Sequence, residues 1–236
     1  MRFDSRQEAI LKCIVDEYIR SAEPVGSRMV SELERLDCSP ATIRNDMATL
    51  EQAGYIAQPH TSAGRVPTEK AYVYYLQHFV EGGRAVKNQE SKNRIQKRMK
   101  EEENDQGDPM KSLAKTLMGL SGEMALVAVD PRRSFYAGVG NLFEKPDFGE
   151  LSVVRELSHL LDRFDDVMGE VFERVQREPE VMIGSDNPFG KEMSAIMVKC
   201  RLPNGQIGIL GLIGPMRMDY EKNIGIIEEV RDILDE

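Results

Sequence analysis

Two neighbouring stretches decide the fold of the first third of the chain: Ser39-Pro40-Ala41-Thr42-Ile43-Arg44-Asn45-Asp46-Met47 and Pro59-His60-Thr61-Ser62-Ala63-Gly64-Arg65-Val66-Pro67-Thr68. In the first, Ser39 can cap a helix, and Pro40 suits its first turn because the missing N–H there costs no hydrogen bond. The second reads as a polar turn between two short strands, at 55–58 and 65–66. A capped helix followed by a basic hairpin predicts a winged helix-turn-helix, and therefore DNA binding before catalysis.

The segments before and after this pair fit the same fold. Residues 6–21 carry apolar side chains on one helical face, and Pro24-Val25-Gly26 ends that helix. Ser27 is then predicted to cap a second short helix. Gly54 is predicted to end the third helix at C′, and Thr68 to begin a fourth.

The third helix has one apolar and one polar face. Ile43, Met47 and Leu50 recur at helical spacing and are expected in the core. The opposite face is small and polar near its N-terminal end, where recognition helices meet base edges. Asn45 suits an adenine edge, and Arg44 suits guanine or a phosphate. The residues opposite the core are Ala41, Asn45, Ala48 and Gln52, with Thr42 and Thr49 on one flank and Arg44 on the other.

The hairpin has two interpretations. As a wing, it would place Arg65 and His60 on the DNA backbone or in the minor groove. As an ordinary β-hairpin, its tip would only meet solvent; beside the third helix, this is the weaker interpretation. The predicted DNA contacts are Ser27, Arg28, Ser39, Ala41, Thr42, Arg44, Asn45, Thr49, His60, Thr61, Ser62 and Arg65.

Composition places the chain among soluble globular proteins of two domains: it has 236 residues, 41% of them hydrophobic and 30% charged. No apolar run approaches the roughly 18 residues that span a bilayer. The first five residues lack the apolar core of a signal peptide. We therefore expect a cytoplasmic protein without a membrane partner.

The cysteines and histidines do not form a metal site. Their spacing matches no usual zinc pattern, so we predict reduced thiols and neither a metal nor a cofactor. A reactive cysteine is the alternative, but small semi-buried residues are the simpler interpretation. The residues concerned are Cys13, Cys38, Cys200, His60, His78 and His159.

The net charge of −9 is unevenly distributed. Residues 1–80 hold 9 basic and 11 acidic residues, residues 81–100 hold 7 and 2, and residues 101–236 hold 15 and 27. The acidity thus belongs to the second half. Because the first domain is not generally basic, DNA binding must depend on a few placed cations, and modest affinity per monomer follows.

The second half alternates helices and strands. Leu113, Leu117 and Leu120 indicate a helix, and residues 148–164 a second, amphipathic one. A last helix begins near Asp219, with Gly214-Pro215 as the turn before it. Strands are predicted at 124–129, 181–183, 195–198 and 206–212. Strands with covering helices predict an α+β domain resembling a sensor.

At this point the residues resemble the heat-inducible transcription repressor HrcA family. The resemblance rests on Pro24 to Ser27, Ser39 to Met47 with Leu50-Glu51, Pro59 to Thr68, Asn141 to Phe148, and on Gly205, Gly208 and Ile213 to Tyr220. It implies a winged helix joined to a GAF-like domain. It also implies a homodimer that represses chaperone genes at an inverted-repeat operator, kept active by the GroEL chaperonin and relieved by heat.

Two features depart from the family pattern. Family members carry a long inserted dimerisation domain where this chain has only Arg132-Arg133-Ser134 between Pro131 and Phe135. Ala71-Tyr72-Val73 stands where Gly-Tyr-Arg is common, so a phosphate-contacting arginine is lost. We predict a shortened member with a winged-helix domain at 1–81, a charged helical linker at 82–109 and a GAF-like dimerisation or regulatory domain at 110–236.

The sequence leaves two rival functions to compare with DNA-binding repression. An enzyme is disfavoured because no paired carboxylates, nucleophile–base set or phosphate loop stands out, so no catalytic residue is assigned. The glycines at 205, 208 and 211 lie in an apolar strand, where close backbone packing explains them better than phosphate binding. The alternative is a winged-helix regulator of other genes that senses a small molecule.

Overall fold

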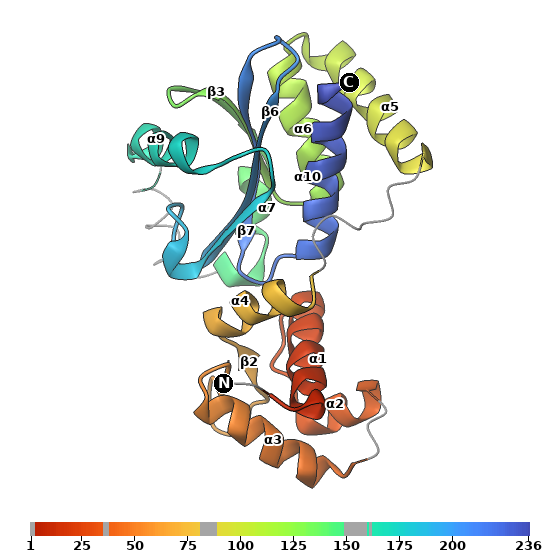
Figure 1. Ribbon diagram of the computed structural model, residues 1–236, viewed down its shortest axis with the longest axis vertical. Coiled ribbons are helices and arrows are strands. Elements are labelled where there is room, and N and C mark those ends of the chain that lie inside the picture. The colour runs from red at the N-terminus through yellow and green to blue at the C-terminus, as the bar shows by residue number, and fades with distance from the viewer. Residues whose placement is uncertain (1–2, 35–37, 81–88, 149–159, 161) are drawn as a thin grey trace. The chain divides into compact units, whose positions relative to one another are not determined.

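The computed structural model of the chain describes residues 3–34, 38–80, 89–148, 160 and 162–236. The chain divides into two compact units, Met1–Glu81 and Gly82–Glu236, each with its own hydrophobic core (Figure 1).

The first unit is the predicted winged helix. Its elements are α1 (Ser5–Ser21), α2 (Ser27–Glu34), α3 (Pro40–Gln52), β1 (Ile56–Ala57), β2 (Val66–Pro67) and α4 (Glu69–His78). The core takes Ile14 from α1, Val30 from α2, Ile43 and Leu50 from α3, and Tyr72 from α4, all essentially inaccessible to solvent. The apolar face predicted for α3 is therefore confirmed.

The predicted ends of the helices can be compared with the observed ones. The Ser39 hydroxyl accepts the Thr42 N–H at 3.2 Å, which confirms the predicted cap of α3, and Gly54 follows the helix with φ +78°. The predicted cap at Ser27 is wrong by one residue. Ser27 is already helical, because the Gly26 carbonyl accepts the Val30 N–H at 3.1 Å and so starts α2.

The second unit is an α+β domain, as predicted. Its sheet has the order β4-β3-β7-β6-β5, with every neighbouring pair antiparallel. The strands are β3 (Met124–Asp130), β4 (Arg133–Ala137), β5 (Glu180–Ile183), β6 (Met193–Arg201) and β7 (Ile207–Pro215). The helices are α5 (Gln89–Gln106), α6 (Pro109–Ser121), α7 (Val139–Phe143), η1 (Pro146–Phe148), α9 (Phe164–Arg174), η2 (Gly184–Asp186) and α10 (Tyr220–Asp235).

Helices cover both faces of this sheet. Helices α6 and α10 pack on one face, with α5 against them, and α9 lies on the other (Figure 1). Alternate strand residues supply the two cores: Leu126 and Ala128 face the α9 side with Met168 and Val171, whereas Ala125 and Val127 face α6. In β7, a Cβ on Gly208 would lie 2.3 Å from the Ala128 carbonyl oxygen. Close packing therefore explains Gly208, as expected. The prediction is wrong for Gly205, which lies before β7 with φ +80°.

Several predicted elements differ from the structure. The charged segment expected as a solvated linker forms α5, which buries Ile95 and packs on α6 and α10 within the second unit. Gly214 and Pro215 belong to β7 and not to a turn, because they pair with Ser194 and Met193 of β6. Strand β4 and helix α7 were not predicted. Most of the helix predicted at 148–164 lies outside the described residues, and its last residue instead begins α9.

Candidate nucleic-acid interface

The exposed face of α3 presents small and polar groups. Ala41, Arg44, Asn45, Ala48 and Gln52 are all exposed, as the helical periodicity predicted. Among the described residues, the Asn45 side-chain amide has no hydrogen-bond partner, so its donor and acceptor are available to a ligand. Ala41 lies in the first turn, where peptide N–H groups have no partner within the helix and the dipole favours an anion.

The charges of α3 are balanced from outside the helix. Its two carboxylates are both paired with arginines of other elements. Asp46 is nearly buried and bound by Arg6, with Nε 2.7 Å from Oδ2. Glu51 is bound by Arg65, with Nη2 2.9 Å from Oε2. Within the described residues, Arg44 keeps only a long 3.4 Å hydrogen bond to the Pro40 carbonyl, so no described carboxylate compensates its charge on the exposed side.

These ion pairs reduce the negative charge on α3 that composition alone predicts. The first 80 residues are net acidic, but the acidic groups of α3 are neutralised by Arg6 and Arg65. A phosphate approaching α3 therefore meets the helix N-terminus and Arg44 without a free carboxylate of this helix beside them.

The wing is fixed at its base and exposed at its tip. Val25 and Arg65 exchange backbone hydrogen bonds of 2.9 and 2.8 Å, which adds the chain before α2 to the β1–β2 pair. Gly64 makes this approach possible, because a Cβ there would lie 2.5 Å from the Val25 carbonyl carbon. Beyond the base, the turn closes through Gln58, whose side-chain amide donates to the Ala63 carbonyl at 3.1 Å.

The predicted contact residues fall into three groups. On α3, Ser39 and Thr42 form the cap, whereas the Thr49 hydroxyl donates to the Asn45 carbonyl and is partly used. At the tip of the wing, His60, Thr61 and Ser62 are all exposed. On α2, Ser27 is half-buried and Arg28 is exposed, paired with exposed Glu32 at 3.0 Å.

The surroundings of Arg65 differ from those predicted. It lies at the base of the wing with its guanidinium on Glu51, and its side chain is only 21% exposed. Its role as a DNA contact stays a prediction; its observed role is to join the wing to the recognition helix. Sequence reasoning missed Arg6, Asp46 and Glu51. One sequence signal could have indicated a partner for Asp46: this acidic residue lies between Ile43 and Leu50 on the buried side of α3.

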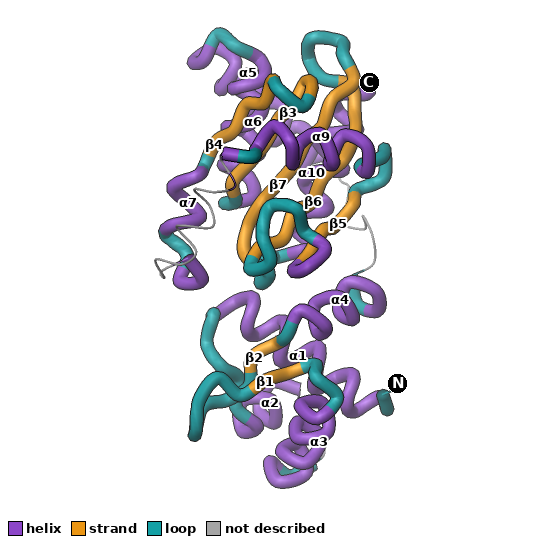
Figure 2. The backbone as a smooth tube through the Cα atoms, turned by 90° about the vertical axis from the view of Figure 1, so that its left-hand side faces the viewer, coloured by secondary structure: helices purple, strands orange, loops and turns teal. Residues whose placement is uncertain are grey.

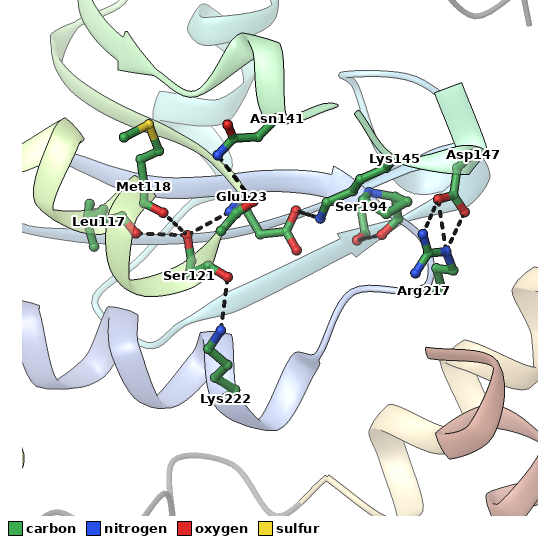
Figure 3. A network of polar contacts seen from close by, with 12 residues as sticks. Leu117, Met118, Ser121, Glu123, Asn141, Lys145, Asp147, Ser194, Arg217 and Lys222 are labelled. Atoms are coloured by element: carbon green, nitrogen blue, oxygen red, sulfur yellow. Dashed lines mark hydrogen bonds and ion pairs between the residues drawn. The ribbon is translucent and has the colours of Figure 1, made fainter. Parts of the chain in front are cut away.

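The two sequence segments of the second unit that resemble the family meet at one end of the sheet. Arg217, after β7, binds Asp147 of η1 with Nη2 2.7 Å from Oδ2, and Lys145 binds Glu123 at the start of β3 (Figure 3). Lys222 of α10 donates to the Ser121 carbonyl at 3.0 Å. These contacts join three parts of the domain and point to a structural role.

The described part of the chain contains no cluster of His, Cys, Asp and Glu that could hold a metal ion. It also contains no helix that is both long and apolar enough to cross a membrane.

The fold and the face of α3 define the chain as a winged-helix protein of the DNA-binding class. Residues 3–80 match the family profile described as "Winged helix-turn-helix transcription repressor, HrcA DNA-binding". Residues 74–224 match "HrcA protein C terminal domain". The chain belongs to the HrcA family.

Individual relatives agree with this assignment. The protein from Halalkalibacterium halodurans named "Heat-inducible transcription repressor HrcA" is 27% identical over 326 positions, covering 95% of this chain and 94% of the relative. That of Thermobifida fusca is 61% identical over 73 residues, or 31% of this chain and 21% of the relative. These relatives are named as repressors and not as enzymes. A crystal structure of a "hypothetical protein" shares the fold, with a TM-score of 0.74 and 19% identity over 99% of this chain and 98% of that one.

The first of these alignments also shows that this chain is shorter. Its 326 positions exceed the 236 residues of the chain by 90, so at least that many positions are occupied only in the relative. At 132–134, where the family pattern places the long insert, β3 and β4 are joined by a tight hairpin in which Asp130 pairs with Arg133.

Proposed function

We propose that this chain represses heat-shock genes, those for chaperones, by binding an inverted-repeat operator as a homodimer. The observation that carries the proposal is the pairing of both α3 carboxylates, which leaves Asn45 and Arg44 as the chemically available groups on the exposed face. Asn45 would read an adenine edge in the major groove, and Arg44 a guanine or a phosphate.

The other predicted residues would position the protein on the DNA backbone. Ser39 and Ala41 lie at the helix N-terminus, and Thr42 and Thr49 flank the base-reading face. Arg28 can exchange its exposed partner Glu32 for a phosphate at small cost, because an exposed ion pair contributes little. The tip residues His60, Thr61 and Ser62 would follow the backbone beside the groove.

Dimerisation would set the spacing of two such helices. A two-fold symmetric dimer places its recognition helices in successive major grooves, which matches an inverted repeat. We assign this role, and regulation, to residues 110–236. From the resemblance to the HrcA family we infer that the protein works in the cytoplasm and depends on the chaperonin GroEL to stay active. Heat would relieve repression by occupying the chaperonin with unfolded clients.

A gel shift on the chain's own chaperone-gene promoter tests the proposal. The full chain is titrated onto the intact inverted repeat, onto a single half-site, and onto a scrambled duplex across a range of salt concentrations. We expect the intact repeat to be bound most tightly, with affinity falling as salt rises. Equal retardation of the intact and scrambled duplexes at low salt would contradict sequence-specific repression.

The regulatory part has a separate test. Heating the purified protein should reduce operator binding, and renaturation with GroEL and ATP should restore it. Binding that recovers equally without GroEL would remove the chaperonin from the proposal while leaving DNA recognition intact.

A further inference from the structure

A groove lies between α6 and the edge strand β4 in the second unit. It encloses a cavity of about 250 Å³ lined by Lys111 and Lys115 of α6 and by residues 134–137 of β4. None of these residues belongs to the DNA-binding face or to the polar network at the other end of the sheet.

The strand side of the groove is an unused sheet edge. Within the described residues, β4 pairs only with β3, so its outer backbone N–H and C=O groups have no strand partner (Figure 2). Phe135 and Ala137 lie opposite Val127 and Ala125 of β3 and therefore share the sheet face that α6 covers. The groove thus has an apolar floor beside a row of backbone hydrogen-bonding groups.

The helix side of the groove is positively charged. Lys111 and Lys115 are one helical turn apart, and neither forms an ion pair with any described residue. Arg132 precedes β4 and Arg133 begins it. The Asp130 carboxylate accepts the Arg132 backbone N–H and pairs with the Arg133 side chain, with Nε 3.5 Å from Oδ2. The opposite edge of the sheet differs, because at β5 the charges are internally paired: Arg174 binds both Glu180 and Asp186.

We propose that this groove binds an extended acidic peptide, which adds a strand to β4. Backbone hydrogen bonds to the edge strand would supply affinity, and side chains at alternate positions would supply specificity. An apolar side chain of the peptide would pack on Phe135 and Ala137, and carboxylates would meet Lys111 and Lys115. A second copy of this chain fits less well, because pairing β4 with itself brings the same cations face to face.

Fluorescence anisotropy with the full chain tests the proposal, using a labelled peptide of alternating glutamate and valine. Replacing both lysines, Lys111→Gln with Lys115→Gln, should weaken binding by about tenfold, since two partly exposed ion pairs are lost. The matched control, Lys97→Gln with Lys191→Gln, removes the same charge from exposed positions elsewhere in the unit and should leave binding unchanged. A control pair as damaging as the groove pair would overturn the proposal.

Two altered peptides test the strand geometry without changing the protein. A peptide with glutamine in place of glutamate should bind at least about tenfold more weakly. A peptide with N-methyl groups at alternate peptide bonds keeps its charge but cannot complete the ladder, so it should also lose binding. Undiminished binding of the methylated peptide would show a charge contact only, and would overturn strand addition.

Light scattering tests whether a second copy of this chain, and not the acidic peptide, occupies the groove. The peptide should bind without changing the mass of the protein in solution. If the peptide instead converts a dimer to a monomer, the edge is already filled by a second copy and the proposal is wrong. This test does not depend on DNA binding.

Discussion

Arg65 at the base of the wing and Glu51 in the last turn of α3 form an ion pair, with the arginine Nη2 2.9 Å from the glutamate Oε2. The pair neutralises a carboxylate on the recognition helix and holds the wing to that helix. Neither side chain is more than one-third exposed, so solvent screens the interaction less than it would a surface pair.

Removing either partner should therefore weaken operator binding through the same contact. We expect Arg65→Ala and Glu51→Ala each to reduce affinity, with the double variant less damaging than the sum and a coupling of about 1 kcal/mol. A double-mutant cycle of operator affinities measures this. Full additivity would show that Arg65 acts directly on DNA and independently of Glu51.

Asn45 should determine sequence preference. Asn45→Ala is expected to cost about 1–3 kcal/mol on the operator and to narrow the difference between operator and scrambled DNA. The control is Gln52→Ala, which removes an exposed amide from the far end of the same helix. Competition gel shifts measure both the affinity for the operator and the difference in affinity between operator and scrambled DNA. An equal loss on both duplexes would assign Asn45 to backbone contact.

Lys145 should stabilise the second unit by pairing with buried Glu123. The Glu123 side chain is only 7% exposed, so Lys145→Met leaves a buried charge without its partner and should lower the free energy of unfolding by about 3–5 kcal/mol. Adding Glu123→Gln should recover part of this loss. Urea unfolding of the full chain measures both.

The control for this pair is Lys191→Met at an exposed site, which should change stability by less than about 0.5 kcal/mol. If the double variant is no more stable than Lys145→Met alone, the ion pair is not the source of the loss.

The Cys200 thiol should be less reactive than the Cys38 thiol. Burial raises the pKa of Cys200 to about 12, with the nearby Asp235 charge adding to the effect. Because the pKa of Cys200 is higher in the folded protein than in the unfolded chain, the protonated thiol stabilises the native state. This contribution is fully present below the ordinary pKa of 9.0, and it is lost as the pH rises from 9.0 toward about 12.

Thiol labelling at pH 8 followed by peptide mapping checks this prediction. Half-buried Cys38 should be modified in the native protein, whereas Cys200 should be modified only after unfolding. Native Cys200 that labels as fast as Cys38 would contradict the expected burial.

The winged helix was predictable because its signals are local. The cap at Ser39, the αL residue Gly54 and the spacing of Ile43, Met47 and Leu50 each act within one or two helical turns. The exposed face of α3 follows from the same periodicity, so the exposure of these α3 residues could be predicted from the sequence. Strand β4 was missed because its five residues are mixed in burial and lack a clear alternation.

The sequence by itself determined the class of fold and the exposed residues of the recognition helix, since capping and periodicity depend on neighbours along the chain. The tertiary structure decided how charge is distributed around them. Arg6 reaches Asp46 across 40 positions and Arg65 reaches Glu51 across the hairpin, and neither pairing has a signature in local sequence. The tertiary structure also decided that the shortened second unit ends in a sheet edge at β4, because strand order follows from packing between distant segments.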